Sequence, residues 1–428
     1  MNYIDIAVAN SLTEEPRAQE LIALLMEKTR GGALGVYKEG MQEIMQPLVT
    51  GTKSPIVREG DFYYLRRNFE RGGSVREHLQ RLLQTTSKFK EMNSSFPLYP
   101  AQEEALKKAL LSPLLILSGG PGTGKTYLAN AIIEAVRAQK PDASILFTAP
   151  TGKASFRIKN PHITQGTLHQ LLGLREHQKP DPKPLIYDLI IVDECSMIDA
   201  KLFSFFLSAI PSGTHLILMG DPNQLPPVEG AAIFSNLFSF PHVRLDQSMR
   251  SDRQGILSLA KYVREGNFDK AFTLLTDPAI KDVNLVSQTK TSPIPLTENV
   301  VFLTPFREQA LLYNTYIEAH KPPHLKTPLI ITKNDYKYNL MNGDIGWKEG
   351  NFGHFPQKIL LSHLTEYELA WAISVHKSQG SEFDHVVLFL PPGSETFGKS
   401  LLYTAITRAK QSVTIASSLE TLKALMIA

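Results

Sequence analysis

One glycine-rich segment carries the clearest chemistry in this sequence. It consists of Gly119, Gly120, Pro121, Gly122, Thr123, Gly124, Lys125 and Thr126. The segment fits the pattern G-x-x-x-x-G-K-[S/T], after an apolar run and before a helical one. Glycines let backbone N–H groups close around phosphate oxygens, and the start of a helix favours negative charge. The pattern predicts a triphosphate site in which Lys125 reaches the β- and γ-phosphates and the Thr126 hydroxyl binds Mg²⁺.

A pair of acids follows a second apolar run. Asp193 would stand at the carboxyl end of a strand, face the phosphate loop and bind Mg²⁺. Glu194, the next residue, would orient or deprotonate the attacking water. Cys195 is the single cysteine, and a small packing residue is a better interpretation of it than a nucleophile. The acid pair predicts hydrolysis of the bound triphosphate.

Three further side chains could sense the γ-phosphate. Gln224 follows an apolar run that ends in Asp221; its amide could contact the γ-phosphate and a neighbouring domain, although an ordinary loop residue is an equal alternative. Arg250 and Arg408 lie beyond the first set of strands. Arginine stabilises the charge of a departing phosphate, so an arginine from a second domain would make the nucleotide a clamp between domains. The alternative for any single arginine is a surface ion pair.

Polar side chains that suit a DNA backbone recur in segments 149–155, 166–173, 303–308 and 375–383. The residues predicted to contact DNA are Thr151, Lys153, His169, Thr304, Pro305, His376, Ser378 and Gln379. Contacts of this kind reach phosphate and sugar, and they give binding that does not depend on base sequence. For His169, a packed loop histidine is an equally good interpretation.

Short apolar runs alternate with helical patterns from residue 98 onward. The runs lie at 114–117, 145–149, 189–194 and 215–220, and a second set lies at 299–304, 385–390 and 412–417. Apolar strands separated by helices are typical of parallel sheets covered by helices on both faces. We therefore predict an α/β fold with two tandem domains.

The predicted boundaries divide the chain into residues 1–95, 96–246 and 247–428. The first part is a small, mostly helical domain that ends in a polar stretch before Pro97. Residues 174–184, with three prolines, predict a loop, and residues 333–369 leave room for only a small β subdomain. Five arginines of the first part could form a nucleic-acid patch, although a solvated helix face is the favoured interpretation. They are Arg66, Arg67, Arg71, Arg76 and Arg81.

The composition narrows the class of protein. The 428 residues are 43% hydrophobic and 20% charged, with a net charge of +3, which indicates a globular chain with a sizeable core. No apolar run approaches the ~18–20 residues of a membrane span, and the first residues lack the pattern of a secretory signal. One cysteine excludes a disulfide framework or a Cys-rich metal site. We therefore expect a cytoplasmic protein, in which any basic groove for nucleic acid is local.

Taken in order, these motifs resemble the complete motif series of a superfamily 1 helicase. The series runs PAQEEAL, GGPGTGKT, TAPTGKAS, TLHQLLG, IIVDECSM, GDPNQLPPV, QSMR, LTPFR, VHKSQGSEF and LYTAITRAK, and it covers roughly residues 98–416. GDPNQLPPV and HKSQGSEF are similar to the RecD-like group, which includes the α subunit of exodeoxyribonuclease V (RecBCD). The opposite-polarity group typified by UvrD and Rep has different motifs at these places. The resemblance implies two tandem RecA-like P-loop domains, the second with a small SH3-like insertion at 333–369.

The resemblance also implies roles for the matching residues. ATP and Mg²⁺ would be the cofactors, Gln102 would read adenine and Glu382 would contact the ribose. Members of the group move 5′→3′ on single-stranded DNA and act at duplex ends. In the RecBCD assembly, which serves double-strand break repair and recombination, this subunit has RecB-like and RecC-like partners, and residues 1–95 would dock on one of them. The short inserts imply a chain that translocates and unwinds with partners.

Three other interpretations stay open. A free-standing RecD-like helicase would usually carry a longer N-terminal region with helix–hairpin–helix repeats, which residues 1–95 do not resemble. RNA helicases of the superfamily typically add zinc-binding regions, and a single cysteine argues against that class. A nucleotide-dependent scaffold without catalysis is disfavoured, because every expected catalytic residue type is present.

Overall fold

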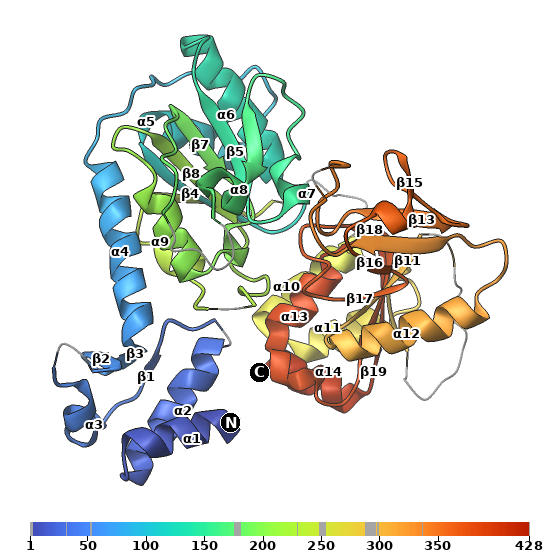
Figure 1. The fold of residues 1–428 in the computed structure, drawn as a ribbon, viewed down its shortest axis with the longest axis horizontal. Coiled ribbons are helices and arrows are strands. Elements are labelled where there is room, and N and C mark those ends of the chain that lie inside the picture. The colour runs from blue at the N-terminus through green and yellow to red at the C-terminus, as the bar shows by residue number, and fades with distance from the viewer. Residues whose placement is uncertain are drawn as a thin grey trace.

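Three bodies make up the molecule. The computed structural model describes residues 3–30, 32–51, 54–174, 181–228, 230–247, 254–286, 297, 299–335 and 337–427. In Figure 1 the N-terminal body is blue, the first α/β body lies above it, and the second α/β body, yellow to red, lies beside both. Among the described helices, none is both long and apolar enough to cross a bilayer.

The first α/β body is built on a parallel sheet. Its strands are β4 (Leu114–Gly119), β5 (Ile145–Ala149), β6 (Thr164–Thr167), β7 (Leu189–Val192), β8 (His215–Gly220) and β9 (His242–Leu245), in the order β6-β5-β7-β8-β4-β9. Alternate residues of β4 point to opposite faces. Leu115 and Leu117 pack with α5 (Pro100–Leu111) and α6 (Lys125–Gln139), while Leu114 and Ile116 share a core with α9 (Ala200–Ser208). The predicted parallel sheet with helices on both faces is confirmed, and its strands end at one common edge.

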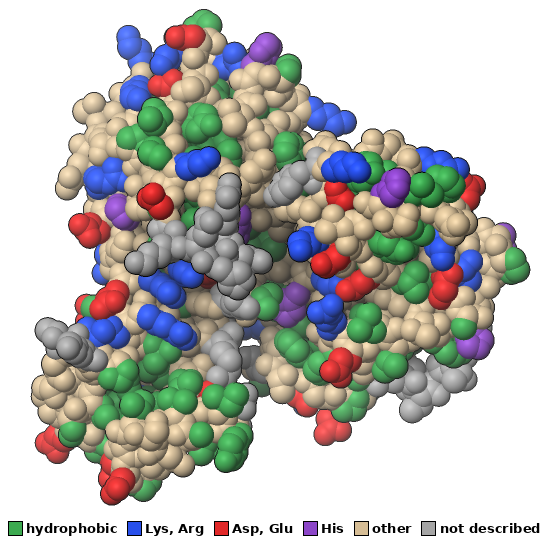
Figure 2. All heavy atoms as spheres, in the orientation of Figure 1, with side chains coloured by type: hydrophobic (Ala, Val, Ile, Leu, Met, Phe, Trp, Pro, Cys, Tyr) green, Lys and Arg blue, Asp and Glu red, His purple; other side chains and the backbone are tan. Residues whose placement is uncertain are grey.

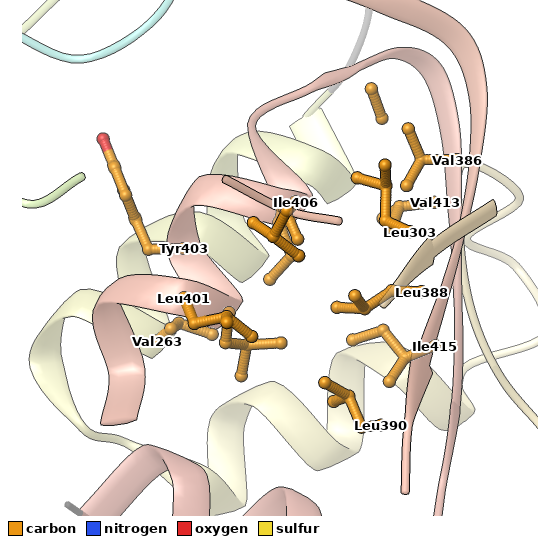
Figure 3. Packing of buried hydrophobic residues seen from close by; sticks show 14 of the residues in the cluster. Val263, Leu303, Val386, Leu388, Leu390, Leu401, Tyr403, Ile406, Val413 and Ile415 are labelled. Carbon is orange, nitrogen blue, oxygen red and sulfur yellow. The ribbon is translucent and has the colours of Figure 1, made fainter. Parts of the chain in front are cut away.

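The second α/β body repeats this plan. Its parallel strands are β10 (Val283–Val286), β11 (Val300–Thr304), β17 (Ala372–Ser374), β18 (Phe383–Leu390) and β19 (Ala409–Ser417), in the order β10-β19-β18-β11-β17. One face packs against α10 (Gln254–Glu265), α11 (Phe268–Thr276), α13 (Gly398–Ile406) and α14 (Leu419–Ile427), and the other against α12 (Arg307–His320). Figure 3 shows Leu303, Leu388 and Ile415 of the sheet facing Leu401 and Ile406 of α13. This core fixes the position of α13 and of the loop that follows it.

A small antiparallel sheet is inserted between α12 and β17. It consists of β12 (Thr327–Ile331), β13 (Ile345–Glu349), β14 (Phe352–His354), β15 (Lys358–Leu360) and β16 (Tyr367–Leu369), in the order β15-β14-β13-β12-β16. The predicted small β subdomain is present, and it begins at β12, before residue 333. Met341 of this insert lies directly against Gly152 of the first α/β body, where any added side chain would collide with it. Of the other predicted interruption, 174–184, residues 175–180 lie outside the described residues.

The N-terminal body has its own core and a helix that leaves it. Its elements are α1 (Tyr3–Leu12), α2 (Pro16–Arg30), β1 (Gly35–Tyr37), α3 (Gln42–Val49), β2 (Ile56–Glu59), β3 (Phe62–Leu65) and α4 (Arg66–Leu83), with antiparallel strands in the order β1-β3-β2. Leu25, Met45 and Tyr63 belong to the core of this body. Val75 and Leu79 of α4 instead join the core beneath the first parallel sheet. The transition between cores therefore lies within α4, and the boundary near residue 95 stays a prediction.

The surface does not gather its charges into one broad patch on the face shown. Figure 2 shows acidic and basic side chains interspersed there, and apolar side chains gathered on the N-terminal body. Arg81 donates to the carbonyl oxygens of Leu207 (3.3 Å) and Ile210 (2.7 Å), and Arg66 donates to that of Gly51 (3.0 Å). These two arginines therefore hold the backbone of neighbouring segments, which differs both from a nucleic-acid patch and from the favoured solvated helix face.

Candidate functional site

The phosphate loop joins β4 to α6 at the shared edge of the first sheet. Two of its glycines adopt positive φ angles, 74° at Gly122 and 81° at Gly124, which side chains would strain. Lys125 opens α6, and its ammonium donates to the carbonyl oxygens of Gly119 (2.6 Å) and Gly120 (3.0 Å). The loop thus folds around its own lysine, with the positive charge held where phosphate oxygens would bind.

Two side chains at the start of α5, one of them just before the helix, support this loop. The Tyr99 hydroxyl donates to the carbonyl oxygen of Thr123 at 3.0 Å, and the Gln102 amide donates to the same oxygen at 3.5 Å. Gln102 is buried and is not among the described residues that line the cavity beside the loop. The structure therefore places Gln102 behind the loop, and its reading of adenine stays a prediction.

The acid pair lies at the end of β7. Glu194 has φ 53° and ψ 39°, a left-handed conformation that costs a residue with a side chain about 1–2 kcal/mol. Asp193 Oδ1 accepts from the backbone N–H of Glu194 at 2.8 Å. One guanidinium nitrogen of Arg157, Nη1, contacts Asp193 Oδ2 at 3.2 Å and Glu194 Oε1 at 3.1 Å. Arg157 was not predicted; it lies just outside the motif at 149–155, and the only sequence signal was its nearness to that motif.

The electrostatics of the pair follow from burial and from three cations. Burial opposes the charge on Glu194, but the charges of Arg157, Arg408 and Lys125 outweigh it and lower its pKa. Burial, followed by the charge of Glu194, raises the pKa of Asp193. Glu194 is therefore anionic at neutral pH, as a residue that orients water must be.

The neighbouring cysteine fits a packing role. Cys195 is fully buried, and burial followed by the charge of Asp193 raises the pKa of its thiol. A thiol kept protonated in this way is a poor nucleophile.

A cavity of about 640 Å³ collects groups from both α/β bodies. From the first body it is lined by the phosphate loop, Lys153, Arg157, Glu194 and Gln224, and from the second by Gly380, Glu382, Arg408 and Lys410. The Arg408 guanidinium is buried and is held by the carbonyl oxygens of Ser381 (3.2 Å) and Thr404 (3.1 Å). The Gln224 side-chain oxygen is buried without a hydrogen-bond partner among the described residues. Arg250, predicted to act here too, lies outside the described residues.

The loop after β8 is held by the second body. The Tyr403 hydroxyl donates to Asp221 Oδ2 at 2.8 Å, and the backbone N–H of Leu225 donates to Thr404 Oγ1 at 2.8 Å. Figure 3 shows Tyr403 pointing away from the apolar cluster of its own body. Burial and the nearby Asp221 raise the pKa of Tyr403, so the phenol stays a donor. The bodies thus meet through buried hydrogen bonds beside the nucleotide cavity.

Some residues predicted to contact DNA lie at this junction. Thr151 has a buried hydroxyl with no partner in the described part of the chain, and it faces Gly380. Lys153 is exposed, and its ammonium donates to Ser381 Oγ at 3.1 Å. The Gln379 amide donates to the carbonyl oxygen of Leu225 at 3.2 Å. The structure thus brings these residues together across the two bodies, where Lys153 also lines the nucleotide cavity.

The remaining predicted DNA contacts are distributed between exposed and buried positions. His169 is exposed on α8 (Leu168–Leu172). His376 is half-buried, and burial lowers its pKa. Thr304 and Ser378 are buried with bonded hydroxyls, and Pro305 is buried beside Thr304. These DNA contacts stay predictions.

Comparison with known families matches both bodies. A model described as an AAA domain matches residues 102–230, and a model described as a UvrD-like helicase C-terminal domain matches residues 369–416. The first match covers the phosphate loop, the acid pair and Gln224. The second covers Gly380, Glu382 and Arg408.

Curated relatives extend this likeness. The chain is 29% identical to the RecBCD enzyme subunit RecD of Mycolicibacterium smegmatis, over 74% of this chain and 70% of that protein. It is 27% identical to the subunit of the same name in Haemophilus influenzae, over 73% and 68%. It is 30% identical to the ATP-dependent RecD2 DNA helicase of Deinococcus radiodurans, over 69% of this chain but only 46% of that protein.

Solved structures agree on the fold. The Pif1 helicase from Bacteroides in complex with ADP-AlF3 and ssDNA aligns with a TM-score of 0.56 at 18% identity, over 78% of this chain and 95% of that one. At this identity the likeness is one of fold alone.

Proposed function

We propose that this chain, which belongs to the RecD-type superfamily 1 helicases, is an ATP-dependent motor that moves 5′→3′ along single-stranded DNA. The observation that carries the proposal is the cavity of about 640 Å³, because neither body supplies its lining alone. The first body contributes Lys125 and Glu194, and the second contributes Arg408. A nucleotide held between two bodies couples hydrolysis to their relative motion.

The groups in the cavity fit a magnesium-bound triphosphate. The hydroxyl of Thr126, which lines the cavity, and the carboxylate of Asp193, which is buried directly beside Glu194, are hard oxygen donors of the kind that Mg²⁺ prefers. The side-chain oxygen of Gln224, which has no hydrogen-bond partner within the described ranges, gives the cavity a buried polar group that a bound molecule could satisfy. We infer that Thr126 and Asp193 hold Mg²⁺, which would neutralise phosphate charge when bound.

We further infer that the chain works as the RecD-type subunit of a RecBCD-type assembly in double-strand break repair and recombination. The relatives named RecBCD enzyme subunit RecD support this arrangement, since the chain spans 70% of the Mycolicibacterium smegmatis protein. RecB-like and RecC-like partners and a cytoplasmic location belong to this proposal. The alternative is a free-standing helicase, which the likeness to the RecD2 DNA helicase of Deinococcus radiodurans supports.

Strand displacement tests the motor. The purified full chain is mixed with ATP and a duplex that carries a single-stranded tail at either its 5′ or its 3′ end, and ATP hydrolysis is followed in parallel. We expect hydrolysis to rise with single-stranded DNA, and displacement or movement only from the 5′ tail. Hydrolysis that DNA leaves unchanged would refute the motor, and activity on the 3′ tail alone would refute the polarity.

Affinity purification from native extract tests the assembly. With a tag on this chain, we expect two larger proteins to co-purify and strand displacement to accompany them. A chain that purifies alone and still displaces strands would favour the free-standing alternative.

A further inference from the structure

Arg157 makes contacts that no motif explains. It follows α7 (Gly152–Ser155), and its guanidinium is partly exposed. Nη1 bonds the carboxylates of Asp193 (3.2 Å) and Glu194 (3.1 Å), while Nη2 donates to the carbonyl oxygen of Gly380 at 3.1 Å. One side chain therefore joins both acids of the first body to the backbone of the second.

Arg157 lies between two segments, one from each α/β body. Its backbone continues from the segment with Thr151 and Lys153, and Gly380 follows directly after Gln379. The Thr151 hydroxyl lies 3.2 Å from where a Cβ on Gly380 would stand, so the two segments are in contact. Both are segments for which the sequence predicts DNA contact. A shift of either segment would therefore move a partner of the Arg157 guanidinium.

We propose that Arg157 is a positioning residue that couples DNA occupancy and closure of the two bodies to the orientation of Asp193 and Glu194. The inference rests on the proposed function, since it assumes that these acids serve ATP hydrolysis and that the two segments face DNA. A guanidinium is a rigid planar fork with several donors, so reorienting one end reorients the other. When the contact to Gly380 changes, the contacts to the acids change with it.

The competing explanation is an ion pair that only stabilises the fold. Asp193 and Glu194 are almost fully buried, and removing the cation beside buried carboxylates destabilises a protein. Loss of activity in a variant would therefore not separate the two explanations. A separating measurement compares a quantity with and without a second ligand in the same variant, because a stability loss alone does not change that coupling.

The experiment measures the coupling between nucleotide and DNA in the full chain. The affinity for a fluorescent oligothymidine is measured by anisotropy with and without ATPγS, and hydrolysis of ATP is measured with and without the same DNA. The variants are Arg157→Gln, Arg157→Lys and the matched control Arg137→Gln. Arg137 also donates to carbonyl oxygens, those of His162 (3.0 Å) and Pro141 (3.2 Å), but on another surface of the first body.

For Arg157→Gln we expect the nucleotide effect on DNA affinity to fall to a ratio of about one, and the DNA stimulation of kcat to fall about tenfold, because charge-assisted hydrogen bonds are lost. The KM for ATP should change less than about threefold, and Arg157→Lys should restore part of both ratios. Arg137→Gln should retain both ratios. Unchanged ratios in Arg157→Gln would overturn the proposal.

Two further outcomes can be distinguished from unchanged ratios in Arg157→Gln. If Arg157→Gln does not fold, Arg157→Lys carries the test, because it keeps a cation beside the acids; wild-type ratios in that variant would overturn the proposal. If the wild-type chain shows neither a nucleotide effect on DNA affinity nor stimulation by DNA, the proposed function itself fails, and the role of Arg157 fails with it.

Discussion

The two parallel sheets of this protein are built alike but supply different chemistry at their edges. The first presents the phosphate loop after β4 and the acids Asp193 and Glu194 after β7. The second presents a buried arginine, Arg408, and a segment whose Gly380 carbonyl oxygen accepts a hydrogen bond from Arg157 of the first body. Under the proposed function, the groups that would act on water and phosphate belong to one sheet, and the arginine that would stabilise the departing phosphate belongs to the other.

This division shows why one α/β body would not suffice. Of the predicted groups, the first body holds Lys125, the two acids and Gln224, which the proposed function assigns to binding and hydrolysis. Arg408 lines the same cavity from the second body, and its neighbours Tyr403 and Thr404 form hydrogen bonds with the loop after β8. Catalysis that needs both sheets ties each turnover to their relative placement.

Lys125→Ala should give the largest effect, because it removes the lysine with which the first sheet's phosphate loop would bind the nucleotide. The ammonium lies within the phosphate loop, bonded to Gly119 and Gly120, and residues 119–126 contain no other cation. We expect nucleotide affinity and turnover to fall to background. Fluorescent ADP binding and ATP hydrolysis measure this, with the exposed Lys201→Ala of α9 as the matched control. Turnover near that of the wild-type chain would remove the phosphate assignment.

Arg408→Gln should distinguish most clearly between the contributions of the two sheets to hydrolysis, since it removes only the cationic side chain that the second sheet supplies. An arginine that stabilises a departing phosphate is worth ~10³–10⁵ in kcat. We expect kcat to fall by about 10³ while nucleotide binding remains within a few fold. Single-turnover hydrolysis and ADP titration measure the two quantities. A variant that loses binding in proportion to turnover would instead indicate that Arg408 mainly holds the ground state.

Glu194→Gln should have a somewhat smaller effect confined to the first sheet. A positioned base contributes ~10²–10⁴ in rate, and we expect a loss of about 10² with nucleotide binding retained. Glutamine keeps the size of the side chain and removes its charge. Glu134→Gln, an exposed change on α6, is the control for loss of a carboxylate. Unchanged turnover in Glu194→Gln would show that another residue orients or deprotonates the attacking water.

Much of the fold was predictable because central strands of parallel sheets are apolar on both faces. The runs at 145–149 and 215–220 coincide with β5 and β8. The edge strand β6 was not predicted, because Thr164–Thr167 is polar and pairs on one side only. β10 and β17 lie at the edges of the second sheet and are short, so their sequence pattern is weak.

The site, like the fold, contains residues that the sequence predicted and residues that it missed. Lys125, Glu194 and Arg408 converge on one cavity, as expected of motifs whose spacing follows from the fold. Arg157 was missed, because its role depends on how far a side chain reaches across a junction of two bodies. Lys153 was predicted to contact DNA but also lines the nucleotide cavity. Residues at such a junction have partners that depend on tertiary packing, and local pattern does not record that packing.

Tyr403→Phe should weaken the junction without touching either set of catalytic groups. The change removes one hydroxyl that donates to the buried Asp221, and such a loss costs about 1–3 kcal/mol. We expect kcat with DNA to fall about fivefold, with little change in nucleotide affinity. Tyr316→Phe, on an exposed tyrosine of α12, is the control. Equal activity in the two variants would show that this hydrogen bond does not transmit domain closure.

Substitutions at the opposite edge of the first sheet should change stability and leave ATP hydrolysis unaffected. His215, at the start of β8, provides the test. Its ring nitrogen Nε2 accepts from the backbone N–H of Lys88 at 3.1 Å, and burial lowers its pKa to about 4. In the unfolded chain the same group titrates near 6.5. The neutral form is thus favoured by folding, so its stabilisation is complete above about pH 6.5 and is lost as pH falls toward about 4.

From about pH 8 to about pH 5.5 this linkage removes about 1.4 kcal/mol of unfolding free energy, which lowers Tm by ~3–5 °C. We expect Tm of the wild-type chain to fall more steeply over this range than that of His215→Gln, with the exposed His162→Gln following the wild type. Differential scanning calorimetry across the range measures the slopes.

ATP hydrolysis by folded His215→Gln at neutral pH should equal that of the wild type, because β8 carries the loop of Gln224 at its other end. Equal slopes in the wild type and His215→Gln would show that this histidine does not stay neutral in the folded chain, and impaired hydrolysis would mean that the two edges of the sheet are not independent.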